Sequence, residues 1–362
     1  MKCVFKNKKI SAVISVVPKE ELRFDDEYPN YKLTEDKARR FKKMMSLDRH
    51  RIAPPEVCSS DLCQYGVERL LAEGTIKKEE IGALLFISQT PDYFIPPTSN
   101  VLHGKLGLGP DVQCFDINQG CAGFPLGLMQ AFMLLDLLPA GQKILLLNGD
   151  TCSKQLSNCN RISYPLAGDA GSVAIVERCA EENPIYMDVK HDGSRHTALM
   201  VPAGAYRIPS SPETMKLQEK EEGVVQSLEH IHMDGPAVFN FTMSDIPAQI
   251  EEVLKFSDNT WESIQHYLLH QPNPFILKQM TEKMKLPPEK LPSNVVSIYG
   301  NCSSVSIPLN IALNCGDILL KEPQRVLLSG FGTGLTWISM VMDLGPLNVC
   351  KIVDYQAVAA AK

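Results

Sequence analysis

A cysteine stands between an expected strand and an expected helix in the segment Asp116–Phe124, DINQGCAGF. The pattern predicts a strand, a tight turn, and a helix that begins at or just after Cys121. Free backbone N–H groups and the positive dipole end of a helix stabilise a thiolate, so we expect a lowered pKa for Cys121. Gly120 and Ala122 leave room for a bulky group beside the sulfur. Cys121 is therefore the candidate nucleophile, and the alternative is a structural buried cysteine.

Three further turns carry polar or glycine residues after apolar runs. A run that ends at His270 is followed by Gln-Pro-Asn, and the run Val295–Tyr299, expected to be a strand, is followed by Gly-Asn-Cys-Ser-Ser. The third turn, Gly330–Gly334, is rich in glycine but lacks the G-x-G-x-x-G spacing of a dinucleotide site. Its backbone N–H groups can instead stabilise an oxyanion. A thiol, an imidazole, an amide and a glycine turn are the groups that nucleophilic acyl transfer requires.

An internal repeat explains how these turns can meet. Three runs in the first half match three in the second at offsets of 181 or 182 residues, among them Cys121 with Cys302 and Gln89 with Gln271. A period this long indicates a duplicated domain. We therefore divide the chain into a half that carries the nucleophile, residues 1–180, and a half that carries the histidine and the asparagine, residues 181–362.

The elements of each half indicate an α/β fold. The apolar runs are continuous, which is typical of strands buried on both faces, and the first strand is expected at Ile10–Val17. Helices are expected at Cys58–Gly74 and at Phe124–Leu138, the second apolar almost all round and therefore buried. Ligands bind beyond the carboxyl ends of such strands, where the turns described above lie.

Composition narrows the classes of function. The 362 residues include 36 Lys and Arg against 42 Asp and Glu, a net charge of −6 that disfavours nucleic acid as the partner. The 11 cysteines form no C-x-x-C pair and show no zinc spacing, so we expect reduced thiols, no metal and a cytoplasmic protein. The longest apolar stretch, Phe124–Ala140, is interrupted and too short to span a bilayer.

One charged, proline-rich segment, Tyr206–Glu222, has no clear period and is expected to be a surface excursion before the first helix of the second half. His230 and His232 lie near it. A metal role for this His-x-His is the weaker alternative, because no carboxylate or cysteine stands at ligand spacing.

The order of these motifs resembles the β-ketoacyl-[acyl-carrier-protein] synthase III family of thiolase-fold condensing enzymes. The resemblance covers about Arg49 to Asp343 and rests on Gly-Cys-Ala-Gly-Phe, His-Gln-Pro-Asn, Gly-Asn-Cys-Ser-Ser and Gly-Phe-Gly-x-Gly-Leu-Thr-Trp. It implies a five-layered α-β-α-β-α fold of two pseudo-equivalent halves, a homodimer, no metal or redox cofactor, and a role in lipid or fatty acid biosynthesis.

The resemblance also implies roles for single residues. Cys121 would accept the acyl group from an acyl thioester, either acyl-CoA or an acyl carrier protein. His270 and Asn301 would bind the carbonyl of malonyl-acyl carrier protein, whose decarboxylation gives the carbanion that forms the C–C bond. The backbone N–H groups of Cys121 and Thr333 would form the oxyanion hole, within a turn that also contains Phe331, Gly332 and Gly334.

The sequence departs from the family pattern at positions that in the family bind the acyl donor or its carrier. Arg40 and Met44 stand where the family commonly has the Trp and Arg that hold coenzyme A, and Phe275 replaces an Arg associated with carrier docking. A basic cluster, Lys37, Arg39, Arg40, Lys42 and Lys43, offers an alternative patch for an acidic carrier, or else is a solvated helix face. Thr333 replaces a common glycine, which matters only if the turn requires positive φ.

Two other functions remain open from the sequence. Related enzymes transfer the acyl group to an oxygen or nitrogen nucleophile without decarboxylation, a possibility that the presence of Asn301 disfavours. A non-catalytic partner subunit is disfavoured because such subunits typically lose the nucleophile, whereas Cys121, His270 and Asn301 are all present here.

Overall fold

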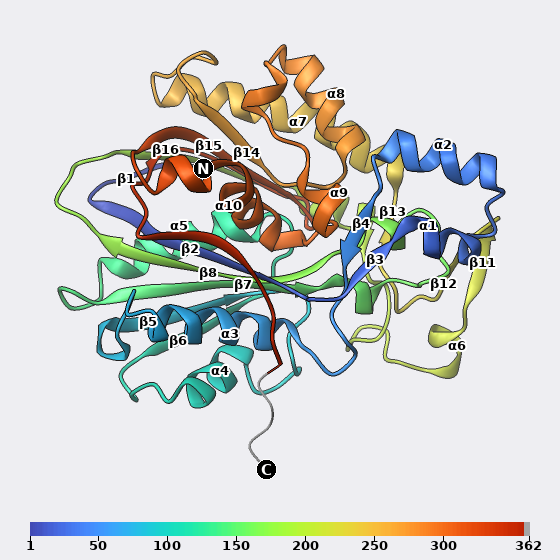
Figure 1. Ribbon diagram of the computed structural model, residues 1–362, viewed down its shortest axis with the longest axis horizontal. Coiled ribbons are helices and arrows are strands. Elements are labelled where there is room, and N and C mark those ends of the chain that lie inside the picture. Colours follow the sequence, from blue (N-terminus) through green and yellow to red (C-terminus); the bar gives the residue numbers. More distant parts are fainter. Residues whose placement is uncertain (358–362) are drawn as a thin grey trace.

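The computed structural model describes residues 1–357 and contains two main sheets (Figure 1). The strands of the first, in spatial order, are β17 (Val349–Asp354), β2 (Lys8–Val17), β8 (Asp169–Arg178), β7 (Lys143–Thr151), β5 (Ile81–Ile87) and β6 (Gln113–Ile117). The strands of the second are β1 (Lys2–Phe5), β9 (Ile185–His191), β16 (Thr336–Leu344), β15 (Gln324–Gly332) and β14 (His266–Leu269).

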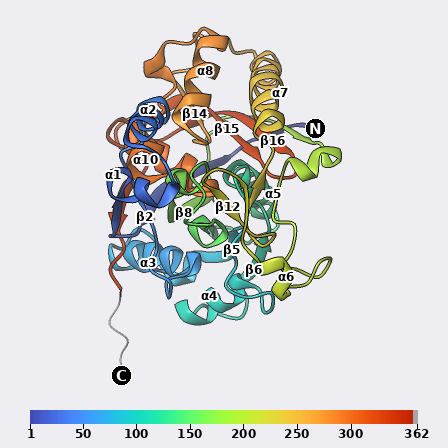
Figure 2. The ribbon, with the colours of Figure 1, turned by 90° about the vertical axis from the view of Figure 1, so that its right-hand side faces the viewer.

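Helices separate and cover these sheets in five layers (Figure 2). Between the sheets lie α5 (Gly123–Leu135) and α10 (Ser306–Leu319), which contact strands of both. The outer layers are α3 (Ser59–Ala72) and α4 (Thr98–Leu106) on the first sheet, and α7 (Gly235–Phe256) and α8 (Pro274–Met284) on the second half. The expected α-β-α-β-α architecture is thus confirmed.

The two sheets repeat the same pairing scheme. In the first, β5 and β7 are parallel, while β7–β8 and β8–β2 are antiparallel. In the second, β14 and β15 are parallel, while β15–β16 and β16–β9 are antiparallel. The terminal strands break the scheme, because β1 joins the second sheet and β17 the first. The boundary at residue 180 stays a prediction, and residues 358–362 of the second half lie outside the described part.

Helix α5 is apolar on all sides because both sheets pack against it. Phe124, Leu128 and Phe132 are fully buried in the core between the sheets. Burial of one such side chain contributes roughly 1.5–3 kcal/mol. This packing fixes the N-terminus of α5, and with it the turn that carries Cys121. The predicted helix at Cys58–Gly74 is confirmed as α3, and the predicted strand at Ile10–Val17 is confirmed as β2. It is not the first strand, because β1 precedes it.

One predicted strand is wrong. The run Val295–Tyr299 forms a short helix, α9, and β14 is the last strand of its sheet. An apolar run of five residues is too short for its periodicity to separate a strand from a buried helix. Val295 is buried in a cluster that includes Val17 and Leu309, and Val296 is buried too, so hydrophobic burial is satisfied without a strand. The turn that carries Asn301 therefore follows a helix.

The remaining elements gather at one end of the molecule, on the right in Figure 1. They are β3 (Glu21–Arg23), α1 (Phe24–Glu27), α2 (Glu35–Met45), β4 (Arg49–Arg51), β10 (Leu199–Met200), α6 (Pro212–Met215), β11 (Gln218–Glu221), β12 (Val224–Gln226) and β13 (His232–Met233). The segment Tyr206–Glu222 is mostly exposed, as expected for a surface excursion, and joins α2 through the ion pair Lys37–Glu222.

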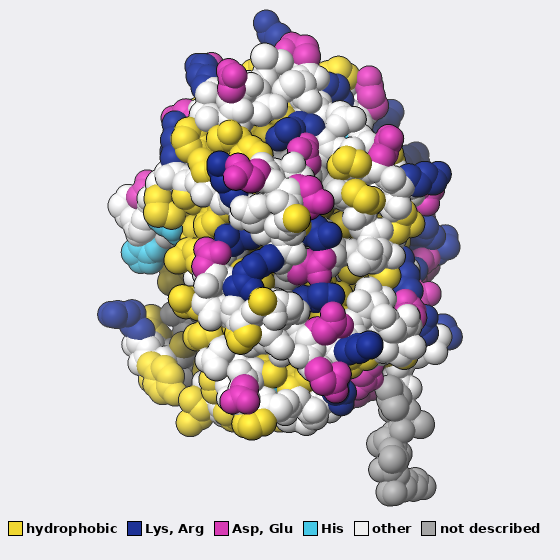
Figure 3. All heavy atoms as spheres, turned by 90° about the vertical axis from the view of Figure 1, so that its left-hand side faces the viewer, with side chains coloured by type: hydrophobic (Ala, Val, Ile, Leu, Met, Phe, Trp, Pro, Cys, Tyr) yellow, Lys and Arg dark blue, Asp and Glu magenta, His cyan; other side chains and the backbone are white. Residues whose placement is uncertain are grey.

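The distribution of charged side chains and the hydropathy of the helices agree with what the composition predicts. On the face that Figure 3 presents, Lys and Arg side chains are interspersed with Asp and Glu, and neither sign forms a continuous patch. Within residues 1–357, helices long and apolar enough to cross a bilayer are absent.

Gly300 gives a test of the turn that holds Asn301. Its φ of 81° and ψ of 178° belong to a region that only glycine adopts easily, and a Cβ atom would overlap the carbonyl oxygen of Ala167. We expect Gly300→Ala to lower the free energy of unfolding by about 1–3 kcal/mol or more. Urea unfolding is the measurement, with Gly109→Ala as control because a Cβ there meets open space. Equal unfolding midpoints for the two variants would contradict the assigned strain.

Candidate active site

A cavity of about 1220 Å³ lies where the turns of the two halves meet. Cys121, His270, Asn301, Phe331, Gly332 and Thr333 all line it. The structure therefore brings Cys121 together with His270 and Asn301, which lie more than a hundred residues further along the sequence. Gly334 belongs to the same turn but does not line the cavity; its φ of 130° serves the turn itself.

Cys121 lies in the turn between β6 and α5, two residues before the helix begins. Its Sγ is 3.9 Å from Ser303 Oγ, which comes from the other half. The turn at Gly332 packs so closely that a Cβ there would lie 2.6 Å from Cys121 Cβ and 3.0 Å from Sγ. Glycine at that position lets the backbone of the turn Gly330–Gly334 approach the sulfur.

His270 directly follows β14, and its backbone N–H donates to Ser329 O at 2.8 Å. Its Nδ1 lies 2.7 Å from Ser306 Oγ, and its ring meets the Phe331 ring edge-on. Ser306 Oγ also accepts the Gln271 N–H at 3.3 Å, so one hydroxyl group contacts both the ring and the backbone of this turn. Burial lowers the pKa of His270 to about 3, so the ring is neutral at neutral pH.

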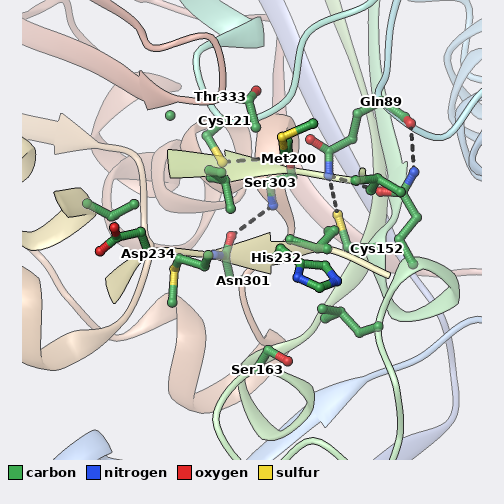
Figure 4. Close-up of a pocket in the computed structure, with 18 of the residues that line it drawn as sticks. Gln89, Cys121, Cys152, Ser163, Met200, His232, Asp234, Asn301, Ser303 and Thr333 are labelled. Atoms are coloured by element: carbon green, nitrogen blue, oxygen red, sulfur yellow. Dashed lines mark hydrogen bonds between the residues drawn. The ribbon is translucent and has the colours of Figure 1, made fainter. Parts of the chain in front are cut away.

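Asn301 is oriented by hydrogen bonds on both sides of its amide. Oδ1 accepts the Ser303 N–H at 3.0 Å, and Nδ2 donates to Pro272 O at 3.3 Å. Its backbone N–H donates to Leu166 O at 2.7 Å. Asn301 Oδ1 is therefore already hydrogen-bonded within the protein. The second N–H of Nδ2 is available to a ligand carbonyl in the cavity (Figure 4).

Thr333 lies between β15 and β16, and Gln119 Nε2 donates to both its carbonyl oxygen and its Oγ1. Thr333 is not among the residues with positive φ, so the turn accepts threonine in place of glycine. Its N–H and that of Cys121 stand on turns that contact each other through Gly332. This arrangement suits stabilisation of the oxyanion that forms on the carbonyl oxygen of an acyl group when the sulfur attacks it.

A buried carboxylate, Asp150 at the end of β7, joins the turns behind the cavity. Oδ1 accepts the Gln89 N–H at 2.9 Å, and Oδ2 accepts the Ser304 N–H at 3.1 Å and its Oγ–H at 2.7 Å. Gln89 follows β5 in the first half, whereas Ser304 follows Asn301 in the second. Burial raises the pKa of Asp150 to about 6, and the hydrogen bonds from Ser304 and Gln89 oppose that rise.

Comparisons with known proteins agree with this geometry. Residues 115–193 match the family model "3-Oxoacyl-[acyl-carrier-protein (ACP)] synthase III" and residues 254–344 match the model of its C-terminal part. A 3-oxoacyl-[acyl-carrier-protein] synthase 3 homologue from Campylobacter jejuni is 33% identical over 359 residues, 98% of this chain and 99% of its own. A β-ketoacyl-[acyl-carrier-protein] synthase III from Streptococcus uberis is 34% identical over 79% of this chain and 85% of its own.

Solved structures indicate the same family. The crystal structure of a 3-oxoacyl-(acyl-carrier protein) synthase from Burkholderia xenovorans superposes with a TM-score of 0.89, at 32% identity, over 98% of this chain and 99% of the other. The chain belongs to the 3-oxoacyl-[acyl-carrier-protein] synthase III family. It has the thiolase fold of that family and is a condensing enzyme of the acyltransferase class.

The structure corrects one expectation about this synthase III chain. Burial raises the pKa of the Cys121 thiol to about 12; the Ser303 hydroxyl opposes the rise, and the charge of Asp150 adds to it. The prediction of a lowered pKa is therefore wrong. The dipole end of α5 is nearby, but the surrounding protein removes the water that would stabilise a thiolate. Cys121 and His270 thus both stand uncharged at neutral pH.

Three departures from the synthase III pattern, Arg40, Met44 and Phe275, lie at exposed positions outside the lining of the cavity. Arg40 lines a hollow of about 180 Å³ together with Leu33, Lys37, Phe41 and Arg161, while Met44 is exposed. Phe275 is partly exposed and its ring stacks on Phe239. In the basic cluster, Lys37, Arg39 and Lys42 form ion pairs with Glu222, Glu35 and Asp25.

The two histidines singled out from the sequence have hydrogen-bonding roles. His232 lines the cavity, where its Nδ1 lies 2.8 Å from Lys220 Nζ and its Nε2 donates to Ser227 O. His230 Nδ1 accepts from Ser227. Among residues 1–357 no group of three or more His, Cys, Asp or Glu side chains could hold a metal ion.

Sequence reasoning assigned no role in the site to Asp150, Ser303 or Gln89, although Ser303 and Gln89 lie in segments that it compared. Asp150 ends a buried strand, and strand ends were the signal used elsewhere, so it could have been found by the same rule. Ser303 and Gln89 act through partners in distant segments, and no local pattern marks such contacts.

Asp150→Asn tests the link between the halves. An amide offers only one acceptor oxygen to two fixed N–H donors, so we expect the free energy of unfolding at pH 7 to fall by about 1–3 kcal/mol. Folding raises the pKa of Asp150, so the folded state binds the extra proton and the carboxyl contributes more stability as pH falls through about 6. The deficit of the variant should therefore be larger at pH 5 than at pH 7.

Urea unfolding at the two pH values measures this difference. Asp111→Asn is the matched control, because Asp111 is exposed. A deficit that shrinks between pH 7 and pH 5 would show that the pKa of Asp150 is not raised.

Proposed function

We propose that this chain loads an acyl group on Cys121 and condenses it with a malonyl thioester, with loss of CO₂, to give a β-ketoacyl thioester. The observation that carries the proposal is the meeting of Cys121, His270 and Asn301 around one cavity in a member of the synthase III family. The names of the relatives, 3-oxoacyl- or β-ketoacyl-[acyl-carrier-protein] synthase, support the same product class.

In the loading step, Cys121 Sγ attacks the carbonyl carbon of an acyl thioester. The new S–C bond replaces the S–C bond of the donor, whose thiol leaves with the proton. Because the thiol starts protonated, the proton must leave as the bond forms, and the positive end of α5 stabilises the charge that develops on sulfur. The backbone N–H groups of Cys121 and Thr333 stabilise the oxyanion.

In the condensation step, Nε2–H of His270 and Nδ2–H of Asn301 donate to the thioester carbonyl of the malonyl unit. Loss of CO₂ leaves the electron pair of the broken C–C bond as an enolate, which these two donors stabilise. The enolate carbon then attacks the acyl carbon on Cys121, and the released cysteine regains a proton. The neutral state of His270 supports this role, because the ring donates a hydrogen bond without presenting a buried charge.

The transfer of the acyl group to an oxygen or nitrogen nucleophile is less well supported. Such a reaction needs no donors for a second thioester carbonyl, whereas Asn301 is held with a free N–H in the cavity and His270 lies in the same cavity. A non-catalytic subunit would not require this orientation of the asparagine.

The donor is an acyl-CoA or an acyl carrier protein, and the extender is malonyl-acyl carrier protein. Lys37, Arg40 and Arg161 surround the small hollow beside α2 and could receive a phosphate of either carrier. Arg40 and Lys43 are the members of the basic cluster without an ion pair to a described residue, which supports α2 as a docking face for an acidic carrier.

A homodimer is the proposed assembly. The outer edge of β6 pairs with no strand among residues 1–357, and Phe115 on it is exposed. Phe94 and Ile95 in the loop after β5, and Tyr206, are 73%, 81% and 85% exposed, respectively. An open sheet edge together with exposed large apolar side chains favours pairing with a second copy of the chain. Phe94 also lines the cavity, so the same interface would adjoin the active site.

Variants that each block one step of the reaction test the roles of Cys121 and Asn301. Wild type incubated with an acyl-CoA should gain the acyl mass, and malonyl-acyl carrier protein should then release CO₂ and β-ketoacyl product. Cys121→Ser should lose acyl loading. Asn301→Ala should still load but should decarboxylate about 10²–10³-fold more slowly, because the enolate loses a donor.

Intact-mass spectrometry and labelled CO₂ release measure the two steps separately. Cys179→Ser, outside the cavity, and Asn294→Ala, on the surface, are the matched controls. Loading of Cys121→Ser at the wild-type rate, or a wild type that transfers acyl groups without CO₂ release, would refute the mechanism.

Disruption of the β6 edge tests the assembly. Phe115→Lys combined with Ile95→Lys places two charges in the proposed interface, and we expect a shift from dimer to monomer in sedimentation velocity. Leu137→Lys removes an apolar side chain after α5 that is as exposed as Ile95, and it should leave the dimer unchanged. A wild-type monomer, or a double variant that still sediments as a dimer, would rule out this interface.

A further inference from the structure

The wall of the cavity beside Cys121 is polar. Gln89, Cys152 and Gln155 all line the cavity, and Gln89 forms hydrogen bonds with the other two. Gln89 Nε2 donates to Cys152 Sγ at 3.4 Å and to Gln155 Oε1 at 3.3 Å. Apolar side chains would serve a saturated acyl chain better, because polar groups lose water when such a chain fills the space.

The orientation of the Gln89 amide follows from its neighbours. The backbone carbonyl of Gln89 can only accept, so the group of Gln155 that lies 3.1 Å from it must be Nε2. Gln155 Oε1 then faces the side-chain amide of Gln89. Because Oε1 can only accept a hydrogen bond, the atom of Gln89 that contacts it must be the donor Nε2. Both hydrogens of Gln89 Nε2 are used, by Cys152 and Gln155. Gln89 Oε1 is therefore fixed on the opposite side of the amide.

That oxygen lies against the residue before the nucleophile. A Cβ added to Gly120 would overlap Gln89 Oε1, which places the oxygen in contact with the Gly120 backbone. Figure 4 shows the Gln89 amide between Cys121 and Cys152, with its oxygen directed away from Cys152. The backbone of Gln89 is itself held by Asp150. No hydrogen bond from residues 1–357 reaches Gln89 Oε1, although a rigid frame holds it.

The free acceptor lies near the path of the acyl group. In the proposed function His270 and Asn301 hold the second thioester, so the acyl chain on Cys121 must extend along another wall of the cavity. The cavity exceeds the upper end of the range of about 300–1,000 Å³ that is usual for small-molecule sites, so it has space for a substituted acyl group. An acceptor on the cavity wall that no described protein group bonds can take a hydrogen bond from a substrate.

We propose that the acyl group loaded on Cys121 carries a hydroxyl group close to its carbonyl, and that this hydroxyl donates to Gln89 Oε1. The proposal rests on the proposed function and names its acyl substrate class. A hydroxyl fits better than an ammonium group, because a neutral amide oxygen does not offset the cost of burying a positive charge. The loading step is unchanged, since the hydroxyl forms and breaks no covalent bond.

Matched thioesters test the proposal on the full-length protein. Butyryl-CoA, 2-hydroxybutyryl-CoA and 3-hydroxybutyryl-CoA are supplied separately at equal subsaturating concentration, and acylation of Cys121 is followed by intact mass. We expect one of the hydroxylated thioesters to load at least about tenfold faster than butyryl-CoA, because a site that hydrogen-bonds a substrate hydroxyl discriminates against an analogue that lacks it. Gln89→Leu should abolish that preference.

Gln356→Leu is the control, since Gln356 is exposed on the segment after β17 and should keep the preference. A wild type that loads butyryl-CoA as fast as both hydroxylated thioesters, or a folded Gln89→Leu that keeps the preference, overturns the proposal. If Gln89→Leu does not fold, the comparison of the three thioesters on wild type decides alone. Absence of acylation by any thioester would instead refute the proposed function itself.

Discussion

The buried carboxylate of Asp150 is the interaction on which the geometry of the active site depends. It is fully buried, and it accepts hydrogen bonds from the turn after β5 and from the turn that follows Asn301. A buried charge is tolerated only when such donors satisfy it, so neither turn can move without leaving the carboxylate unpaired. One side chain thus holds residues of both halves at a fixed separation. The raised pKa of Asp150 is the cost of that arrangement.

The same burial governs the reactive groups. Cys121 and His270 lie in a part of the molecule where burial raises the pKa of the thiol and lowers that of the imidazole, so both are neutral before the reaction. The site therefore does not store a thiolate–imidazolium pair. Its fixed N–H donors and the dipole of α5 act only as charge develops during bond formation, which is how an oriented, water-poor site stabilises a transition state more than a ground state.

The sequence alone predicts much of this, because continuous apolar runs, glycine turns and the 181-residue repeat are local or periodic signals. They place Cys121, His270 and Asn301 at the ends of elements, and the structure brings the three to one cavity. Two failures have physical causes. The five-residue run before Asn301 folds as α9, because hydrophobicity without a readable period does not distinguish a helix from a strand. The pKa of Cys121 depends on water exclusion by segments from the other half, which no local pattern records.

The repeat also shows why residue type alone cannot assign a role. Cys302 stands at the position equivalent to Cys121, but it is fully buried and its thiol bonds to the carbonyl oxygens of Tyr299 and Gly300. Gln271 is equivalent to Gln89 in the repeat, yet its buried Nε2 donates hydrogen bonds to Leu269 O and Pro292 O. In each pair the residue of the first half lines the cavity, and the residue of the second half forms hydrogen bonds with backbone carbonyl groups. Duplication supplied the same side chains twice, and the cavity, which opens on only one member of each pair, decides which of them can meet a substrate.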